Sequence, residues 1–137
     1  MSPSLQLGCA LAAVTLLLAC DGAQELREKQ SAGGVLLALQ VLREAGNAEK
    51  AKALAGLAQA PCLGEGVCEL RDACRAAYAL HIEGLTLTQA AKQQLADGKP
   101  LEAAKLVGSA EEKLEAAGTK VDDCTDRAGT LKRRYQL

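Results

Sequence analysis

The chain has 137 residues, with 16 Lys and Arg against 17 Asp and Glu and a formal net charge of −1. This balance lacks the basic excess of a nucleic-acid-binding protein, so no nucleic-acid partner is expected. Two tyrosines are the only Phe, Trp or Tyr residues, which disfavours sites that stack sugars or bases. The core must therefore consist of Leu, Ala and Val, as in closely packed helices.

The first segment in chain order is an uncharged apolar run from Leu5 to Ala19. As a helix it would span about 22 Å, short of the roughly 30 Å hydrocarbon core of a bilayer. That length is typical of the apolar region of a signal peptide. Residues 1–8 lack the Lys or Arg that usually precedes such a region. A cleaved signal peptide is favoured, and an uncleaved anchor or a buried core helix is the alternative.

The run closes with Leu17-Leu18-Ala19-Cys20, which resembles the lipobox of bacterial lipoproteins. In that family a signal peptidase cuts before the cysteine, and the cysteine then carries acyl chains such as palmitate. The resemblance implies a signal peptide over 1–19, with Leu17, Leu18 and Ala19 forming the cleavage site, and lipidation of Cys20. It also implies anchoring in the bilayer of the bacterial cell envelope, at the outer membrane or at the periplasmic face of the inner membrane.

Residues 20–137 have the length of a single domain, and their apolar positions repeat with a helical period. We expect helices over about 23–45, 47–60 and 67–97, ending at Gly46, Pro61 and the Asp97-Gly98-Lys99-Pro100 turn. A fourth helix should stop near Gly118, and a short fifth should cover 121–135. The predicted fold is all-α, with four to five helices.

Each of these helices has an apolar face that should point to the core. The faces of the second, third and fourth helices are Ala51, Leu54, Ala55 and Ala58; Leu70, Cys74, Ala77, His81, Leu85, Thr88, Ala91 and Leu95; and Leu101, Ala104, Val107, Gly108, Ala110, Leu114 and Ala117. The first helix contributes Leu36, Leu37, Leu39, Val41 and Leu42.

A weak internal repeat aligns Gly46 with Gly98 and pairs Leu54 with Leu106. Each copy has a glycine turn before a helix rich in small residues, and residues 98–105 resemble a degenerate tetratricopeptide hairpin. The offset between the copies is far from the usual period of about 34 residues. A small bundle of antiparallel helical hairpins is therefore preferred to a tetratricopeptide-like array.

Four cysteines remain if Cys9 leaves with the signal and Cys20 is acylated, namely Cys62, Cys68, Cys74 and Cys124. An even number in an exported chain predicts two disulfides, for which three connectivities are possible. Two glycines between Cys62 and Cys68 allow the chain to turn back, whereas Cys74 and Cys124 each lie on an apolar stripe. We favour the pairs Cys62–Cys68 and Cys74–Cys124; the second would contribute on the order of 4 kcal/mol.

The pattern Cys-x5-Cys-x5-Cys does not match the spacing of metal sites, and His81 is the only histidine, so neither a metal nor a cofactor is expected. His81 falls on an apolar face, where a structural role is more common than catalysis. Ser31 and Ser109 lack a nucleophile elbow. We therefore expect a protein that is not an enzyme.

Two functions fit a small helical domain held at a membrane. The first is a non-enzymatic interaction or accessory module, whose groove between helices accepts a helix or peptide of a cell-envelope protein. Pilotins, small helical lipoproteins that serve secretion or pilus channels, have a similar size and disulfide use, which is a likeness of architecture alone. The second function is binding of a lipid or small apolar ligand between the helices. We favour the first.

Overall fold

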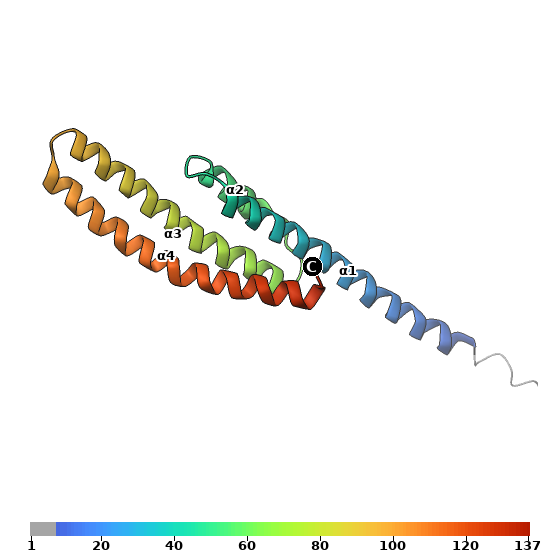
Figure 1. The fold of residues 1–137 in the computed structure, drawn as a ribbon. Coiled ribbons are helices and arrows are strands. Elements are labelled where there is room, and N and C mark those ends of the chain that lie inside the picture. Colours follow the sequence, from blue (N-terminus) through green and yellow to red (C-terminus); the bar gives the residue numbers. More distant parts are fainter. Residues whose placement is uncertain (1–7) are drawn as a thin grey trace, which may run out of the picture.

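The computed structural model describes residues 8–137, with side chains from Gly22 onward. This part of the chain contains α1 (Gly8–Glu44), α2 (Lys50–Gln59), α3 (Glu65–Ala96) and α4 (Pro100–Tyr135), and no strand. α2 turns back along α1, and α3 and α4 form a long antiparallel hairpin (Figure 1). The prediction of an all-α fold with four to five helices is confirmed.

Both expected disulfides are present and tie the helices together. Cys62–Cys68 closes the loop between α2 and α3, with Cα atoms 5.0 Å apart. Cys74–Cys124 joins α3 to α4, with Cα atoms 4.9 Å apart, and both of its side chains are fully buried. The second bridge therefore fixes the register of the α3–α4 hairpin.

The α3–α4 hairpin packs as an antiparallel coiled coil with small residues at its seam. The buried side chains recur every seven residues, at Leu70, Ala77, Gly84 and Ala91 on α3 and at Ala103, Ala110, Ala117, Cys124 and Leu131 on α4. A sustained seven-residue repeat keeps one seam facing the partner helix. A Cβ built on Gly84 would lie 2.7 Å from Leu114 Cγ, so the two helices approach closely at this point.

The expected break near Gly118 is wrong, because α4 runs without interruption from Pro100 to Tyr135. A helical glycine costs about 1 kcal/mol relative to alanine. The seam continues across Gly118 from Ala117 to Cys124, and the disulfide at Cys124 adds a larger stabilisation. Packing therefore overrides the local preference of the glycine.

The predicted core faces are only partly correct, because some of their members are buried and others are exposed. On α4, Ala110 and Ala117 of the predicted face are buried in the seam, whereas Leu101 is 75% exposed and Val107 is also exposed. On α3, Leu95 is exposed. On α2, the fully buried side chain is Leu57, which the predicted stripe of Ala51, Leu54, Ala55 and Ala58 omits.

The main core lies at one end of the long hairpin. It combines α1 residues such as Leu39 and Leu42 with Leu57 of α2, Leu70 of α3 and Leu131 of α4. The seam residues from Gly84 to Ala117 are not part of this cluster. The far half of the α3–α4 hairpin, called the tip below, therefore extends past the core as a two-helix element (Figure 1).

The lengths of the helices distinguish a small bundle of helical hairpins from a tetratricopeptide-like array. Gly46 and Gly98 both lie in turns between helices, as the weak repeat predicts. However, α3 and α4 have 32 and 36 residues, so that each alone is about as long as a whole tetratricopeptide unit of two helices. The small bundle is the better description.

Candidate functional site

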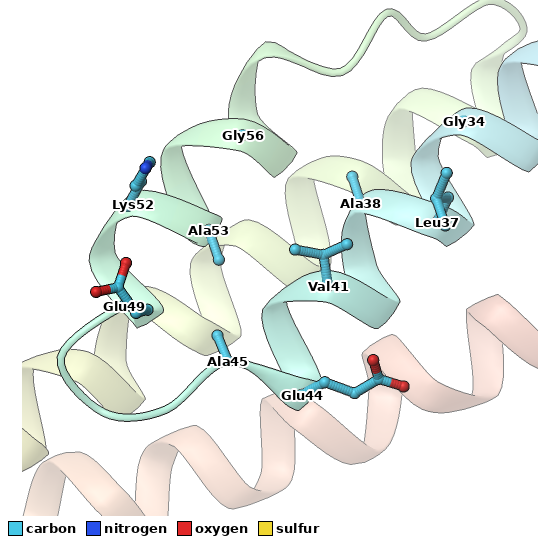
Figure 2. Close-up of a pocket in the computed structure, with 10 residues that line it drawn as sticks. All are labelled: Gly34, Leu37, Ala38, Val41, Glu44, Ala45, Glu49, Lys52, Ala53 and Gly56. Carbon is cyan, nitrogen blue, oxygen red and sulfur yellow. The ribbon is translucent and has the colours of Figure 1, made fainter.

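A groove between α1 and α2, here called the α1–α2 groove, opens on the described surface (Figure 2). Its volume is about 710 Å³. Its lining consists mainly of apolar and small residues, namely Gly34, Leu37, Ala38, Val41 and Ala45 of α1 and the adjoining turn and Ala53 and Gly56 of α2. Gly34, Ala38, Val41 and Ala45 follow one another at steps of three or four residues, and Leu37 lies one turn before Val41, so they form one continuous stripe along the helix.

Two large apolar side chains of this stripe are open to solvent. Leu37 is 63% exposed and Val41 is 53% exposed, and both side chains are drawn on the groove side of α1 in Figure 2. Single exposed leucines are common on protein surfaces, but contiguous apolar patches mark interaction sites. Here two successive turns of one helix present the apolar side chains together.

Small residues beside the two large ones leave room for another backbone. A Cβ at Gly34 or Gly56 would meet no heavy atom within 4 Å, so the fold itself does not require glycine at either position. Ala38 and Ala53 add only methyl groups between them (Figure 2). A helix lying in the groove could therefore approach both α1 and α2 closely.

Charged side chains border the apolar floor. Glu44 stands on the α1 side, and Glu49 and Lys52 stand on the α2 side (Figure 2). Glu44 also accepts a hydrogen bond from Gln40 Nε2, at 2.9 Å. An apolar centre with a polar edge of both signs is the usual anatomy of a protein-binding surface.

A groove between helices was expected, but the residues that line it were not predicted, although the sequence carries a signal for them. At about 100° per residue, Leu36, Leu39 and Leu42 share one side of α1, whereas Leu37 and Val41 lie roughly opposite. Assigning all five to one core face is wrong, because a single helix face cannot hold them. The excess of apolar residues indicates two apolar faces.

The other candidate residues have structural surroundings. Ser31 Oγ donates a hydrogen bond to the Pro61 carbonyl at 3.0 Å and accepts one from the Leu63 N–H at 2.8 Å, which holds the disulfide loop against α1. His81 is half-buried on α3, and burial together with the charge of Lys50 lowers the pKa of its imidazole. Among the side chains described, no three His, Cys, Asp or Glu residues gather as metal ligands.

The residues predicted to form the cleavage site and the lipidation site lie in the backbone of α1, but the side chains of Leu17, Leu18, Ala19 and Cys20 are outside the described set. From Gly22 to Arg27 every side chain is exposed, and this part of α1 extends beyond the bundle (Figure 1). No helix in the described part of the chain has both the length and the apolar character needed to cross a membrane.

The extended part of α1 joins the bundle at Glu28. The Tyr135 hydroxyl donates a hydrogen bond to Glu28 Oε2 at 2.9 Å, and Arg134 lies 3.8 Å from the same oxygen. The hydrogen bond from Tyr135 is the main cause that lowers the pKa of Glu28. These contacts link the end of α4 to α1 at the point where α1 leaves the bundle.

Comparison with known proteins adds no assignment: the chain matches no protein-family model, no curated protein and no solved structure.

Proposed function

We propose that this protein is a lipid-anchored accessory module that holds an amphipathic helix of a cell-envelope protein in the α1–α2 groove. The observation that carries the proposal is the exposed pair Leu37 and Val41 beside the small residues Gly34 and Gly56. An apolar stripe at helical spacing in an open groove suits the helix-in-groove mode of recognition.

The anchor and the groove share one helix. If Cys20 carries acyl chains, as its lipobox sequence implies, Leu37 stands 17 residues further along α1, which is about 26 Å at 1.5 Å per residue. The groove would then face a partner within a few nanometres of the bilayer surface. This distance suits a membrane protein with a segment on the same side of the membrane.

The expected affinity follows from the exposed apolar groups. Full burial of a Leu or Val side chain is worth about 1.5–3 kcal/mol, so covering the exposed parts of Leu37 and Val41 contributes roughly 2–3 kcal/mol in total. This gain is small compared with the cost of association. Confinement of both proteins to one membrane would raise the effective concentration and compensate for the modest contact energy.

The shape of the groove favours a helix over a lipid. Pockets for small ligands commonly enclose 70–90% of the ligand surface. The α1–α2 groove is instead open to solvent along the surface between the two helices, and its large apolar side chains, Leu37 and Val41, are exposed (Figure 2). A pilotin-like role belongs to the same class of accessory function. The experiment below would identify the partner protein.

Site-specific photocrosslinking in intact cells tests the proposal. A photoreactive residue at position 37 or 41 of the full chain should give an adduct with one protein, and the crosslinked peptide should form the apolar face of a helix. The matched control is position 107, where an exposed valine lies on α4. Identical adducts at all three positions, or adducts with lipid alone at 37 and 41, would show that the proposal is wrong.

A further inference from the structure

A second hollow, here called the basic pocket, lies where all four helices meet beside the end of α1. Its volume is about 460 Å³. Arg43, Lys50, Tyr78 and His81 supply its polar groups, and Leu114 and Val121 line its apolar wall. None of the residues that line it is acidic.

The two basic side chains of the basic pocket, Arg43 and Lys50, have only neutral hydrogen-bond partners. Arg43 donates from Nε to the Tyr78 hydroxyl at 3.4 Å and from its second terminal nitrogen to Thr125 Oγ1 at 3.0 Å. Lys50 Nζ donates to the Leu42 carbonyl at 3.3 Å. The ion pairs found among the described side chains involve Arg71, Lys113, Arg127 and Arg134, and neither Arg43 nor Lys50.

Lys50 is the unusual member because it is only 9% exposed. Lysine is almost never buried to this degree without a charged partner. Its bond to Leu42 satisfies a carbonyl in the last turn of α1, a favourable position for a cation. That bond uses one of three ammonium protons, so the other two are available to a ligand.

We propose that the basic pocket binds the phosphate group of a phosphomonoester, through charge-assisted hydrogen bonds from Arg43 and Lys50. A phosphomonoester carries close to two negative charges at neutral pH, which matches two basic side chains better than the single charge of a carboxylate does. The Tyr78 hydroxyl accepts from Arg43 and keeps its own proton to donate. Leu114 and Val121 would contact a short apolar substituent on the phosphate.

The position of the basic pocket favours a soluble phosphomonoester over a lipid headgroup of the anchoring membrane. Arg43 is 23 residues along α1 from Cys20, or about 35 Å at 1.5 Å per residue. If Cys20 is acylated, as the proposed function holds, the headgroups of its bilayer would lie at the other end of this distance. The inference is independent of the α1–α2 groove, because Arg43 and Lys50 do not line the groove.

Titration of the full-length protein in detergent, in buffer free of phosphate and sulfate, tests this inference. The probes are inorganic phosphate, n-butyl phosphate, hexanoate and vesicles with phosphatidic acid in a neutral phospholipid. Both soluble phosphates should bind and should shift the NMR resonances of the His81 imidazole, and hexanoate should bind at least tenfold more weakly. Binding of the phosphatidic acid vesicles alone would overturn the assignment to a soluble ligand.

Charge-removing variants locate the site. Lys50→Met and Arg43→Gln should each weaken n-butyl phosphate binding at least tenfold, whereas Lys105→Met, which removes an exposed lysine of α4, should leave it unchanged. Because Lys50 also contacts the end of α1, circular dichroism checks that each variant stays helical, and the Arg43 variant carries the test if the Lys50 variant unfolds. The inference would be overturned if all three substitutions weakened n-butyl phosphate binding equally, or if inorganic phosphate at millimolar concentration did not bind to the unsubstituted protein.

Discussion

Substitution of Gly84 by alanine tests the close approach of α3 and α4 described above. Alanine is a better helix former than glycine by about 1 kcal/mol, so the change would stabilise an isolated helix. In the protein, the added Cβ would lie 2.7 Å and 2.8 Å from Leu114 Cγ and Cδ2 and 3.3 Å from the Ala110 carbonyl oxygen. Overpacking of this kind costs typically about 1–3 kcal/mol. We therefore expect Gly84→Ala to destabilise the protein by about 1 kcal/mol.

Gly108 provides the matched control, since it lies inside α4 and a Cβ there would meet nothing within 4 Å. Gly108→Ala should therefore stabilise the protein by about 0.5–1 kcal/mol. Removing the main obstacle with Leu114→Ala should restore the benefit at position 84, so that Gly84→Ala becomes neutral or stabilising in that background. The coupling between the two sites should be about 1 kcal/mol or more.

Urea denaturation followed by circular dichroism, with the disulfides intact, gives these free energies of unfolding. Near the melting temperature, about 1 kcal/mol corresponds to roughly 4 °C for a domain of this size. If Gly84→Ala and Gly108→Ala stabilise the protein equally, the two helices are further apart at Gly84 than described. An equal effect of Gly84→Ala with and without Leu114 would exclude that side chain as the cause.

Three further predictions concern the disulfides, pH and the anchor. Replacing both cysteines of Cys74–Cys124 by alanine should lower the free energy of unfolding in urea by about 4 kcal/mol, against roughly 2.4 kcal/mol for Cys62–Cys68, because Cys74–Cys124 closes the longer loop. Equal losses for the two pairs would contradict the loop-length explanation. The pKa of Glu28 is lowered from about 4.5, mainly by the Tyr135 hydrogen bond, so its contribution to stability is present above that pH and is lost as pH falls through the lowered value. Glu28→Gln should therefore make the free energy of unfolding depend less on pH at acidic pH. An unchanged pH dependence would show that Glu28 does not contribute to it. Cys20→Ala should release the protein from membranes or leave uncleaved precursor in cell fractionation, whereas unchanged acyl labelling and membrane retention would refute the lipoprotein interpretation.

The sequence predicted the features that depend on parity and period. Setting aside Cys9, which lies in the apolar N-terminal run, and Cys20, as the lipobox resemblance implies, left four cysteines for two bridges. The glycines between Cys62 and Cys68 favoured the observed pairing. The helical period was sufficient to predict the all-α fold. The turn at Gly98 was also predicted, and there Gly98 has a φ of 72°, a left-handed conformation that glycine adopts most readily.

The face that each helix packs against its neighbour was harder to predict, because hydrophobicity alone does not show which residues lie where two helices approach closely. On α4, Leu101 and Val107 are more apolar than the alanines of the seam, yet the alanines are buried. Only small side chains allow the separation that α3 and α4 adopt, so the strict seven-residue spacing of Ala103, Ala110 and Ala117 was the better signal. The basic pocket could not be predicted, because its lining comes from helices far apart in sequence.

The position of the Cys74–Cys124 bridge at the edge of the main core affects how the tip would open. The tip lacks the large buried side chains of the core and has small residues at its seam, so its amides should exchange with solvent before those of the core. When it opens, the chain between the two cysteines remains a closed loop, with ends 4.9 Å apart at their Cα atoms. The two helices of the hairpin then stay near each other while the tip is open, which lowers the entropic barrier to reclosing. The protein can therefore undergo repeated local opening at one end while the end that carries α1 keeps its native packing.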